Sequence, residues 1–494
     1  MAGAPSGTQP VEHGGQPQVG RRGGRWRHAV SMAVLFVLAL VVLGAEASTA
    51  PFEGDEADYT ATSRYFGYWF MAGGLQREEW DGNHWTRTQP PLTRYIVGAW
   101  LMARGYDLES LNKPYVSTAS SFEVNRSKGR VPTDDVLAAA RQPMVLLGAG
   151  AVTLLYPLGV LLSGPLAGLV AVALAISSPF LRYTLVHAWA EAPLACFLLL
   201  AAVLAALAVR RLVSGGARSL PGGRAGARWR WWGGGLVLAL GLALGLAAAT
   251  KLTGLVGAPL VVAGVAVILL WQRRTLSAEQ VRGLVTTAAS ATVVMLLVIF
   301  AVNPFLWRGP VEGLSSMVAQ RQREMTEQQK QWPEYAVLRV AERPWLTAVG
   351  ITRAGPWGDV VPVAVPVGLG LGLLGVVVSA GRLRRQEIAG DSASTVAAAP
   401  NGSQAPNGDG ATIMMLLVWL LGYTAAIVAG LGLNYPRYFL PSMLLLIPFM
   451  GAGTAFIVER VLHLTRGRAA TPRTAHQSQM HPHAAASSVT APGD

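Results

Sequence analysis

Ten stretches of the sequence are apolar over about 17–25 residues, which is long enough for each to cross the hydrocarbon core of a membrane as a helix. They lie near residues 29–48, 142–163, 165–183, 188–209, 233–250, 252–271, 283–303, 358–381, 411–433 and 438–458. Only 14% of the 494 residues are charged, too few to cover the surface of a soluble protein of this length. The sequence therefore predicts an all-α, polytopic integral membrane protein.

The net charge of +13 comes from short arginine-rich blocks that lie beside the apolar stretches. With ten spans, all of these blocks fall on one side of the membrane, and the positive-inside rule assigns that side to the cytoplasm. We expect both termini in the cytoplasm and the connections 49–141 and 304–357 on the outer face. We also expect the protein to reside in the plasma membrane. Basic blocks of this kind are typical of membrane proteins, so nucleic acid is not an expected partner.

Segments rich in Gly, Ala, Pro, Ser or Arg mark the ends of the chain and two internal loops, 213–228 and 388–410. We expect a disordered basic tail over 1–28, a membrane domain over 29–458 and a second disordered tail over 459–494. A cleaved signal peptide ending near "LGAEASTA" is the alternative for the N-terminus. The single cysteine, Cys196, excludes an internal disulfide and any multi-cysteine zinc site.

Ionisable residues gather where the predicted spans end on the outer side. The densest cluster, "FEGDEADYT", follows the first span and contains four carboxylates. Charged groups at membrane depth are costly, so they normally form a site or pair with one another. Their place at one face favours an active site there over the midplane site of a transporter. The residues concerned are Asp55, Glu56, Arg182, His187, Glu191, Lys251, Arg437 and Tyr438.

Each of these residues also has a purely structural interpretation. Asp55 could be the N-cap of an interfacial helix. His187 could hydrogen-bond a neighbouring loop. Lys251 and Arg437 could be anchors that extend to lipid phosphates, and Tyr438 could belong to the aromatic belt of the membrane interface.

Two segments of the first outer connection are predicted to lie in the membrane interface as helices. "TQPPLTRYIVGAW" carries Arg94 and is too short to span, and its two prolines end any preceding helix. "YTATSRYFGYWFMAGGL" has the same character. Together they would form the wall of a cavity that opens to the membrane.

At this point the sequence resembles a known family. "GDEADY", "TQPPLTRYIVGAW", "AARQPMVLLGAGAVTLLYPLG", "SPFLRYTLVHAWAEAPLACFLLL", "GLALGLAAATKLTGL" and "RYFLP" occur in the order found in the GT-C class of membrane glycosyltransferases. The resemblance is strongest to the protein O-mannosyltransferases of family 39 and to the aminoarabinose transferases that modify lipid A. It covers most of residues 29–458. Gln89 and Glu191 depart from it, because relatives commonly have His or Lys and Asp there.

The resemblance implies that a sugar passes from a polyprenyl-phosphate donor to an acceptor hydroxyl, with inversion. A carboxylate would take the proton of the hydroxyl, and cations would stabilise the departing phosphate. Asp55 would be the general base, with Glu56 orienting the acceptor or the donor. The other expected substrate-binding residues are Glu191, Lys251, Arg437, Tyr438, His187 and Arg94.

Several partners and alternatives stay open at the level of sequence. The acceptor is a lipid, a glycan or a protein, and membrane lipids surround the chain. Metal dependence differs among the relatives, so a divalent metal ion held with the help of Glu191 is one option. A transporter or flippase for a lipid-linked sugar is the second candidate function, and an inactive assembly subunit is the third.

Overall fold

The computed structural model describes residues 20–70, 73–76, 78–80, 84–117, 121–214, 224–353, 355–357, 360–396 and 408–469. Within these ranges the regular structure is helical, with a single isolated bridge between Ala336 and Leu433. The helices of the bundle are α1 (Gly20–Thr49), α7 (Asp134–Ser163), α8 (Pro165–Ser177), α9 (Pro179–Val186), α10 (Glu191–Val213), α11 (Arg224–Thr250), α12 (Gly257–Trp271), α13 (Ala278–Val302), α16 (Val361–Val396), α17 (Gly408–Gly430) and α18 (Leu440–Ala469).

The connections contain shorter helices. They are α2 (Gly54–Thr62), α3 (Tyr65–Phe70), α4 (His84–Thr88), α5 (Leu92–Ala103), α6 (Phe122–Ser127), α14 (Pro310–Gln331) and α15 (Arg343–Ile351). Single 3-10 turns are η1 (Gly74–Gln76), η2 (Glu78–Trp80), η3 (Leu108–Ser110), η4 (Leu252–Val256), η5 (Pro304–Leu306), η6 (Pro333–Tyr335), η7 (Val340–Glu342) and η8 (Pro436–Phe439).

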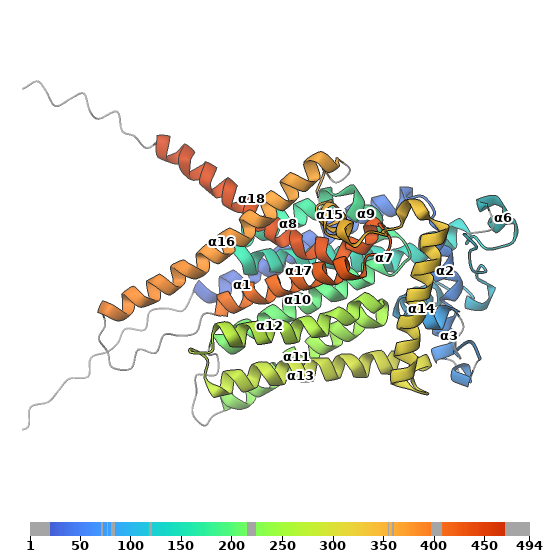
Figure 1. The fold of residues 1–494 in the computed structure, drawn as a ribbon, viewed down its shortest axis with the longest axis horizontal. Helices are drawn as coiled ribbons and strands as arrows, with labels where there is room; N and C mark the ends of the chain where they lie inside the picture. The colour runs from blue at the N-terminus through green and yellow to red at the C-terminus, as the bar shows by residue number, and fades with distance from the viewer. Residues whose placement is uncertain are drawn as a thin grey trace, which may run out of the picture.

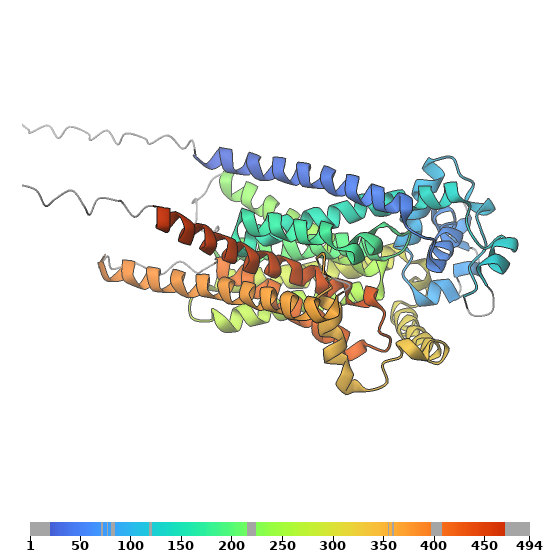
Figure 2. The same ribbon diagram turned by 90° about the horizontal axis from the view of Figure 1, so that it is seen from above.

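The bundle helices run side by side, and α2 to α6 gather with α14 at one end, which we call the loop end (Figure 1). Here α14 lies across the direction of the bundle (Figure 1). Helix α1 begins and α18 ends at the opposite end of the bundle (Figure 2). Because both ends of the helical chain lie at the same end of the bundle, the chain crosses the bundle an even number of times.

Every predicted span corresponds to a helix or a helix pair, and one of them differs from a single continuous helix. Eight helices in the described part of the chain are long and apolar enough to cross a membrane. The span predicted near 165–183 is not one continuous helix, because α8 and α9 meet at an angle of 74°. Pro179 begins α9, and the Ser178 side chain caps it by accepting from the Leu181 N–H at 3.3 Å. The stretch 233–250 forms the apolar part of α11, which begins at Arg224.

Several helices extend past the predicted ends of their spans. Helix α1 begins at Gly20 and α18 continues to Ala469, so the parts of the tails next to the bundle are helical and not disordered. Helix α16 likewise continues to Val396, into the predicted disordered loop. The remaining residues of these segments lie outside the described ranges.

Helix α10 lies in the interior of the bundle. It packs against α7, α11 and α17, and small residues such as Ala195, Ala202 and Ala206 are buried along it. Small side chains let membrane helices approach closely. Because α10 begins at Glu191, this packing places a carboxylate inside the protein at the loop end.

Candidate active site

A cavity of about 310 Å³ lies at the loop end, between α2, α10, η4, α14, α17 and η8. Its lining has a polar part and an apolar part. The polar part consists of Asp55, Tyr59, Thr88, Gln89, Glu191, Lys251, Thr253, Arg321, Gln328, Arg437 and Tyr438. The apolar part includes Leu194, Leu252, Val256, Ala426, Ile427 and Leu431. The cavity therefore suits a molecule with a charged head and an apolar chain.

Asp55 and Arg437 form an ion pair in this cavity. Arg437 Nη1 donates to Asp55 Oδ2 at 2.5 Å, and the Asp55 side chain is 48% exposed. The Arg437 guanidinium lowers the pKa of Asp55 below its ordinary value of 3.8, although burial acts in the opposite direction. Arg437 also lies over the ring of Trp189, 5.1 Å from its centroid. Asp55 is thus an ionised carboxylate with part of its surface open to the cavity.

A second ion pair joins Glu191 to Lys251. Lys251 Nζ lies 2.7 Å from Glu191 Oε1, and the Glu191 side chain is almost fully buried. Lys251 comes directly after α11, where the chain turns into η4. Its ammonium also lies 5.6 Å from the ring centroid of Tyr438. The structure therefore brings together Asp55, Glu191, Lys251, Arg437 and Tyr438, five residues that the sequence singled out.

A third basic residue of the cavity, Arg321, was missed by the sequence analysis. It belongs to α14, and its Nη2 donates to the Tyr438 hydroxyl at 3.0 Å. The segment "RQREMTEQQK" is so polar that any of its charges could have faced solvent. The available signal was helical spacing, since Met325 and Gln328 follow Arg321 at i+4 and i+7 and line the same cavity.

The four carboxylates of the acidic cluster after α1 have different surroundings. Glu53 is the N-cap residue of α2 and accepts from the Tyr183 hydroxyl, so the interpretation of Asp55 as the N-cap is wrong. Asp58 accepts from the Tyr115 N–H at 2.8 Å, and burial raises its pKa to about 7. Among the four, only Asp55 lines the cavity.

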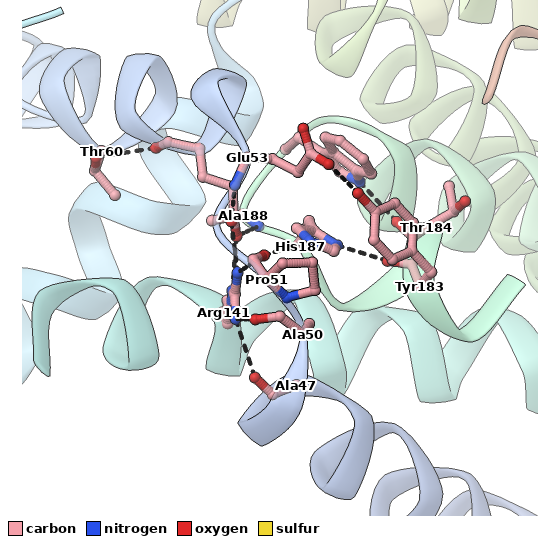
Figure 3. A network of polar contacts seen from close by, with 12 residues as sticks. Ala47, Ala50, Pro51, Glu53, Thr60, Arg141, Tyr183, Thr184, His187 and Ala188 are labelled. Carbon is pink, nitrogen blue, oxygen red and sulfur yellow. Dashed lines mark hydrogen bonds and ion pairs between the residues drawn. The ribbon is translucent and has the colours of Figure 1, made fainter. Parts of the chain in front are cut away.

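Glu56 is fully buried and forms a two-point ion pair with Arg141 of α7. Arg141 Nε and Nη2 lie 2.8 and 2.6 Å from the Glu56 oxygens. Figure 3 shows Arg141 among the backbone carbonyls at the end of α1, where it donates to Ala47, Ala50 and Pro51. Glu56 does not line the cavity. Its position favours a structural role, in which it fixes α2 against α7 and thereby places Asp55.

His187 and Arg94 also lie outside the cavity lining. The two ring nitrogens of His187 lie 2.7 and 3.1 Å from the carbonyl oxygens of Tyr183 and Pro51 (Figure 3). Arg94 donates to the carbonyl of Gln89 at 3.2 Å and so supports the segment that lines the cavity. The structure gives both residues backbone partners and does not bring either to the cavity wall.

A metal site has little support in this geometry. Within the described ranges, no group of three or more His, Cys, Asp or Glu side chains is placed to hold a metal ion. Asp55 and Glu191 are the carboxylates of the cavity, and each already pairs with a basic side chain. The residues present therefore do not fit a divalent ion.

No family profile and no curated protein matches the sequence. Among solved structures, the chain is similar to the archaeal oligosaccharyltransferase AglB from Archaeoglobus fulgidus in complex with an inhibitory peptide and a dolichol-phosphate. The TM-score is 0.53 at 14% identity, over 91% of this chain and 53% of that one. An Archaeoglobus fulgidus oligosaccharyltransferase tethered to an acceptor peptide also has a TM-score of 0.53 at 14% identity, over 88% of this chain and 50% of that one.

The chain is also similar to ArnT from Cupriavidus metallidurans bound to undecaprenyl phosphate, with a TM-score of 0.47 at 16% identity over 89% of this chain and 64% of that one. It spans about half the length of the oligosaccharyltransferase. The similarity to the oligosaccharyltransferase confirms the helical membrane fold that the motifs predicted. Over about half the length of AglB, the chain shares its fold, a GT-C-like arrangement of helices.

Proposed function

We propose that the protein is a membrane glycosyltransferase that moves a sugar from a polyprenyl-phosphate donor to an acceptor hydroxyl. The observation that carries this proposal is the composition of the cavity. It combines a half-exposed carboxylate, Asp55, with three basic side chains and an apolar wall. The oligosaccharyltransferase of the same fold, whose structure contains a dolichol-phosphate, supports this donor class.

The donor would bind with its phosphate between Lys251, Arg321 and Arg437. Basic side chains in a site that excludes water stabilise the negative charge that builds up on a departing phosphate. The polyprenyl chain would follow the apolar part of the lining, which Leu252 and Ile427 represent. This pose keeps the lipid on the membrane side of the cavity and the sugar near Asp55.

Asp55 would take the proton of the acceptor hydroxyl as its oxygen attacks the anomeric carbon. The bond between that carbon and the phosphate oxygen breaks, and the lipid phosphate leaves with the electron pair. A single displacement inverts the anomeric carbon. A donor phosphate that draws Arg437 away from Asp55 would raise the pKa of this carboxyl, because Arg437 is the main cause of its lowering. Donor binding would thus make Asp55 a stronger base.

The same basic side chains would neutralise the phosphate without a resident metal ion. In metal-dependent enzymes, a divalent ion supplies this charge stabilisation. Here, Lys251, Arg321 and Arg437 would supply it. Glu191 would hold Lys251 in place.

The loop end would face the outside of the cell, with both termini in the cytoplasm. Arg210 and Arg211 at the end of α10, and Arg273 and Arg274 after α12, lie at the opposite end of these helices from the cavity. The positive-inside rule places such residues in the cytoplasm. The acceptor would then reach the cavity from the outer medium or from the outer leaflet.

Reconstitution distinguishes this enzyme from a flippase. Purified protein in liposomes would be given polyprenyl-phosphate sugars that differ in the labelled sugar, together with lipid, glycan and protein acceptors. We expect release of polyprenyl phosphate and an acceptor product with the inverted anomeric configuration. Movement of an intact lipid-linked sugar between leaflets, without cleavage of its phosphate bond, would contradict the proposal and favour the carrier.

A further inference from the structure

Glu324 of α14 lies between the cavity residue Arg321 and His84 of α4. Arg321 Nη1 donates to Glu324 Oε2 at 3.2 Å. On the other side, His84 Nδ1 lies 3.2 Å from Glu324 Oε1. Arg321 in turn donates to Tyr438, which lines the cavity. A chain of polar side chains therefore leads from α4 to the cavity.

The two ends of this chain differ in their access to water. The His84 side chain is 56% exposed and that of Glu324 only 14%. Glu324 Oε1 is shielded from solvent and makes no well-aligned hydrogen bond within the described part of the chain. A buried carboxylate oxygen without a donor is costly. His84 is placed to supply a charge to that oxygen, and it remains open to protons from the medium.

Helix α4 also belongs to the cavity wall. It packs on α14 and ends at Thr88, which lines the cavity together with Gln89. The contact between His84 and Glu324 thus links two elements that border the same cavity.

We propose that Glu324 positions Arg321 for the donor phosphate and that His84 makes this positioning dependent on pH. The proposal rests on the proposed function, because it needs an anionic ligand in the cavity. Glu324 is a positioning residue here, since it acts through Arg321.

The sign of the effect follows from the charges. When His84 is neutral, Arg321 is the cation that compensates Glu324, and this ion pair competes with the donor phosphate for Arg321. When His84 is protonated, it compensates Glu324 instead, and Arg321 is released to interact with the phosphate. Phosphate binding should therefore strengthen as the pH falls through the range in which a histidine changes charge. By linkage, bound phosphate should favour protonation of His84.

The charged groups around His84 support this assignment. On α14, Glu324 faces the ring and Arg321 lies beyond it. On α4, Trp85 contacts the imidazole edge to face, with 4.7 Å between ring centroids. Arg87 is the other basic residue of that helix.

The test measures binding of undecaprenyl phosphate to the purified protein at about pH 5.5 and about pH 8, which lie on either side of the titration of histidine. The matched variant is His84→Gln, which keeps a hydrogen-bonding side chain but cannot gain a charge. For each protein, the affinity at the lower pH is divided by the affinity at the higher pH. Titration of the lipid phosphate itself affects both proteins equally, so it cancels when these two affinity ratios are compared. We expect the affinity ratio of wild type to exceed that of His84→Gln about threefold to fivefold, as for a partly exposed ion pair.

A second arm tests the route through Arg321. In an Arg321→Met background, His84→Gln should no longer change the pH dependence, because the phosphate-binding group is gone. Glu324→Gln should flatten the pH dependence in the same way as His84→Gln. If the contact between α4 and α14 were purely structural, these variants would instead change the stability of the protein and leave the ratio of affinities at the two pH values as in wild type.

The outcomes separate this inference from the proposed function. If wild type and His84→Gln both bind the lipid normally and have the same ratio of affinities at the two pH values, the role of His84 is contradicted and the proposed function stays intact. An effect of His84→Gln that persists without Arg321 would contradict the route. Failure of wild type to bind undecaprenyl phosphate at either pH would contradict both the proposed donor and this inference.

Discussion

Asp55 on α2 and Arg437 in η8, just before α18, are 382 residues apart in the sequence, yet Arg437 donates to the Asp55 carboxylate at 2.5 Å. This pair links the long connection after α1 to the segment that leads into α18. It places the expected proton acceptor beside an expected phosphate ligand. In the proposed reaction, proton removal and departure of the phosphate would therefore both depend on this contact.

Lys251→Met should weaken use of the donor. It removes one of the cations that face the phosphate, and a hydrogen bond to a charged group contributes about 1.5–3 kcal/mol, so donor affinity should fall about tenfold to a hundredfold. The matched control is Lys330→Met, which removes a lysine whose ion pair with Glu327 is exposed. Binding of undecaprenyl phosphate to both variants is the measurement. Equal effects of the two substitutions would contradict the role of Lys251.

Glu56→Gln should affect folding and not the chemical step. It leaves Arg141 buried with an incomplete partner, and breaking a buried ion pair costs about 3–5 kcal/mol. Less folded protein in the membrane and a lower Tm are the expected results. Turnover per folded molecule should change far less. A variant with normal abundance and Tm but a large loss of turnover would restore Glu56 as a catalytic residue.

Asp58→Asn should change the pH dependence of stability. Burial raises the pKa of Asp58 from 3.8 to about 7 in the folded protein, so this group stabilises the fold below its unfolded pKa. That contribution is lost as the pH rises towards 7. Asp58→Asn has no charge to bury and keeps an acceptor for the Tyr115 N–H. Its Tm should exceed that of wild type at about pH 8 and match it at about pH 4, and the opposite order would contradict the assignment.

Cysteine labelling tests the orientation in the membrane. In a Cys196→Ala background, Lys330→Cys on α14 should react with an impermeant reagent added to intact cells. Arg273→Cys, after α12, should react only once the membrane is opened. Both side chains are exposed in the structure, so access to the thiol reports the side of the membrane. The reverse pattern would invert the proposed topology.

The apolar stretches were sufficient to predict the spans, because crossing a membrane imposes length and composition directly on the sequence. The bend between α8 and α9 was less visible, since Ser178 and Pro179 interrupt the helix without adding charge. The ends of α1 and α18 were also missed, because basic residues can continue a helix beyond the membrane.

Part of the cavity lining was predicted from the sequence, because a charged residue stands out beside an apolar stretch. Glu191, Lys251 and Arg437 stood out because each interrupts or borders an apolar stretch. Arg321 lies in a polar helix, where no charge stands out. Glu56 and Asp55 are adjacent in the sequence, yet one faces Arg141 and the other the cavity. The rotation of α2 decides this difference, and it is set by long-range contacts that no local pattern records.

The central claim, that Asp55 is the general base, is tested most directly by comparing Asp55→Asn with Asp58→Asn. Both variants exchange a carboxylate for an amide of the same size on the same helix, but only Asp55 lines the cavity. Each would be reconstituted at matched amounts of folded protein, and sugar transfer would be measured with saturating donor. We predict that transfer by Asp55→Asn falls by about 10²–10⁴-fold, the usual contribution of general-base catalysis, while Asp58→Asn stays near wild type. Near-normal transfer by Asp55→Asn, or an equal loss in both variants, would contradict the account.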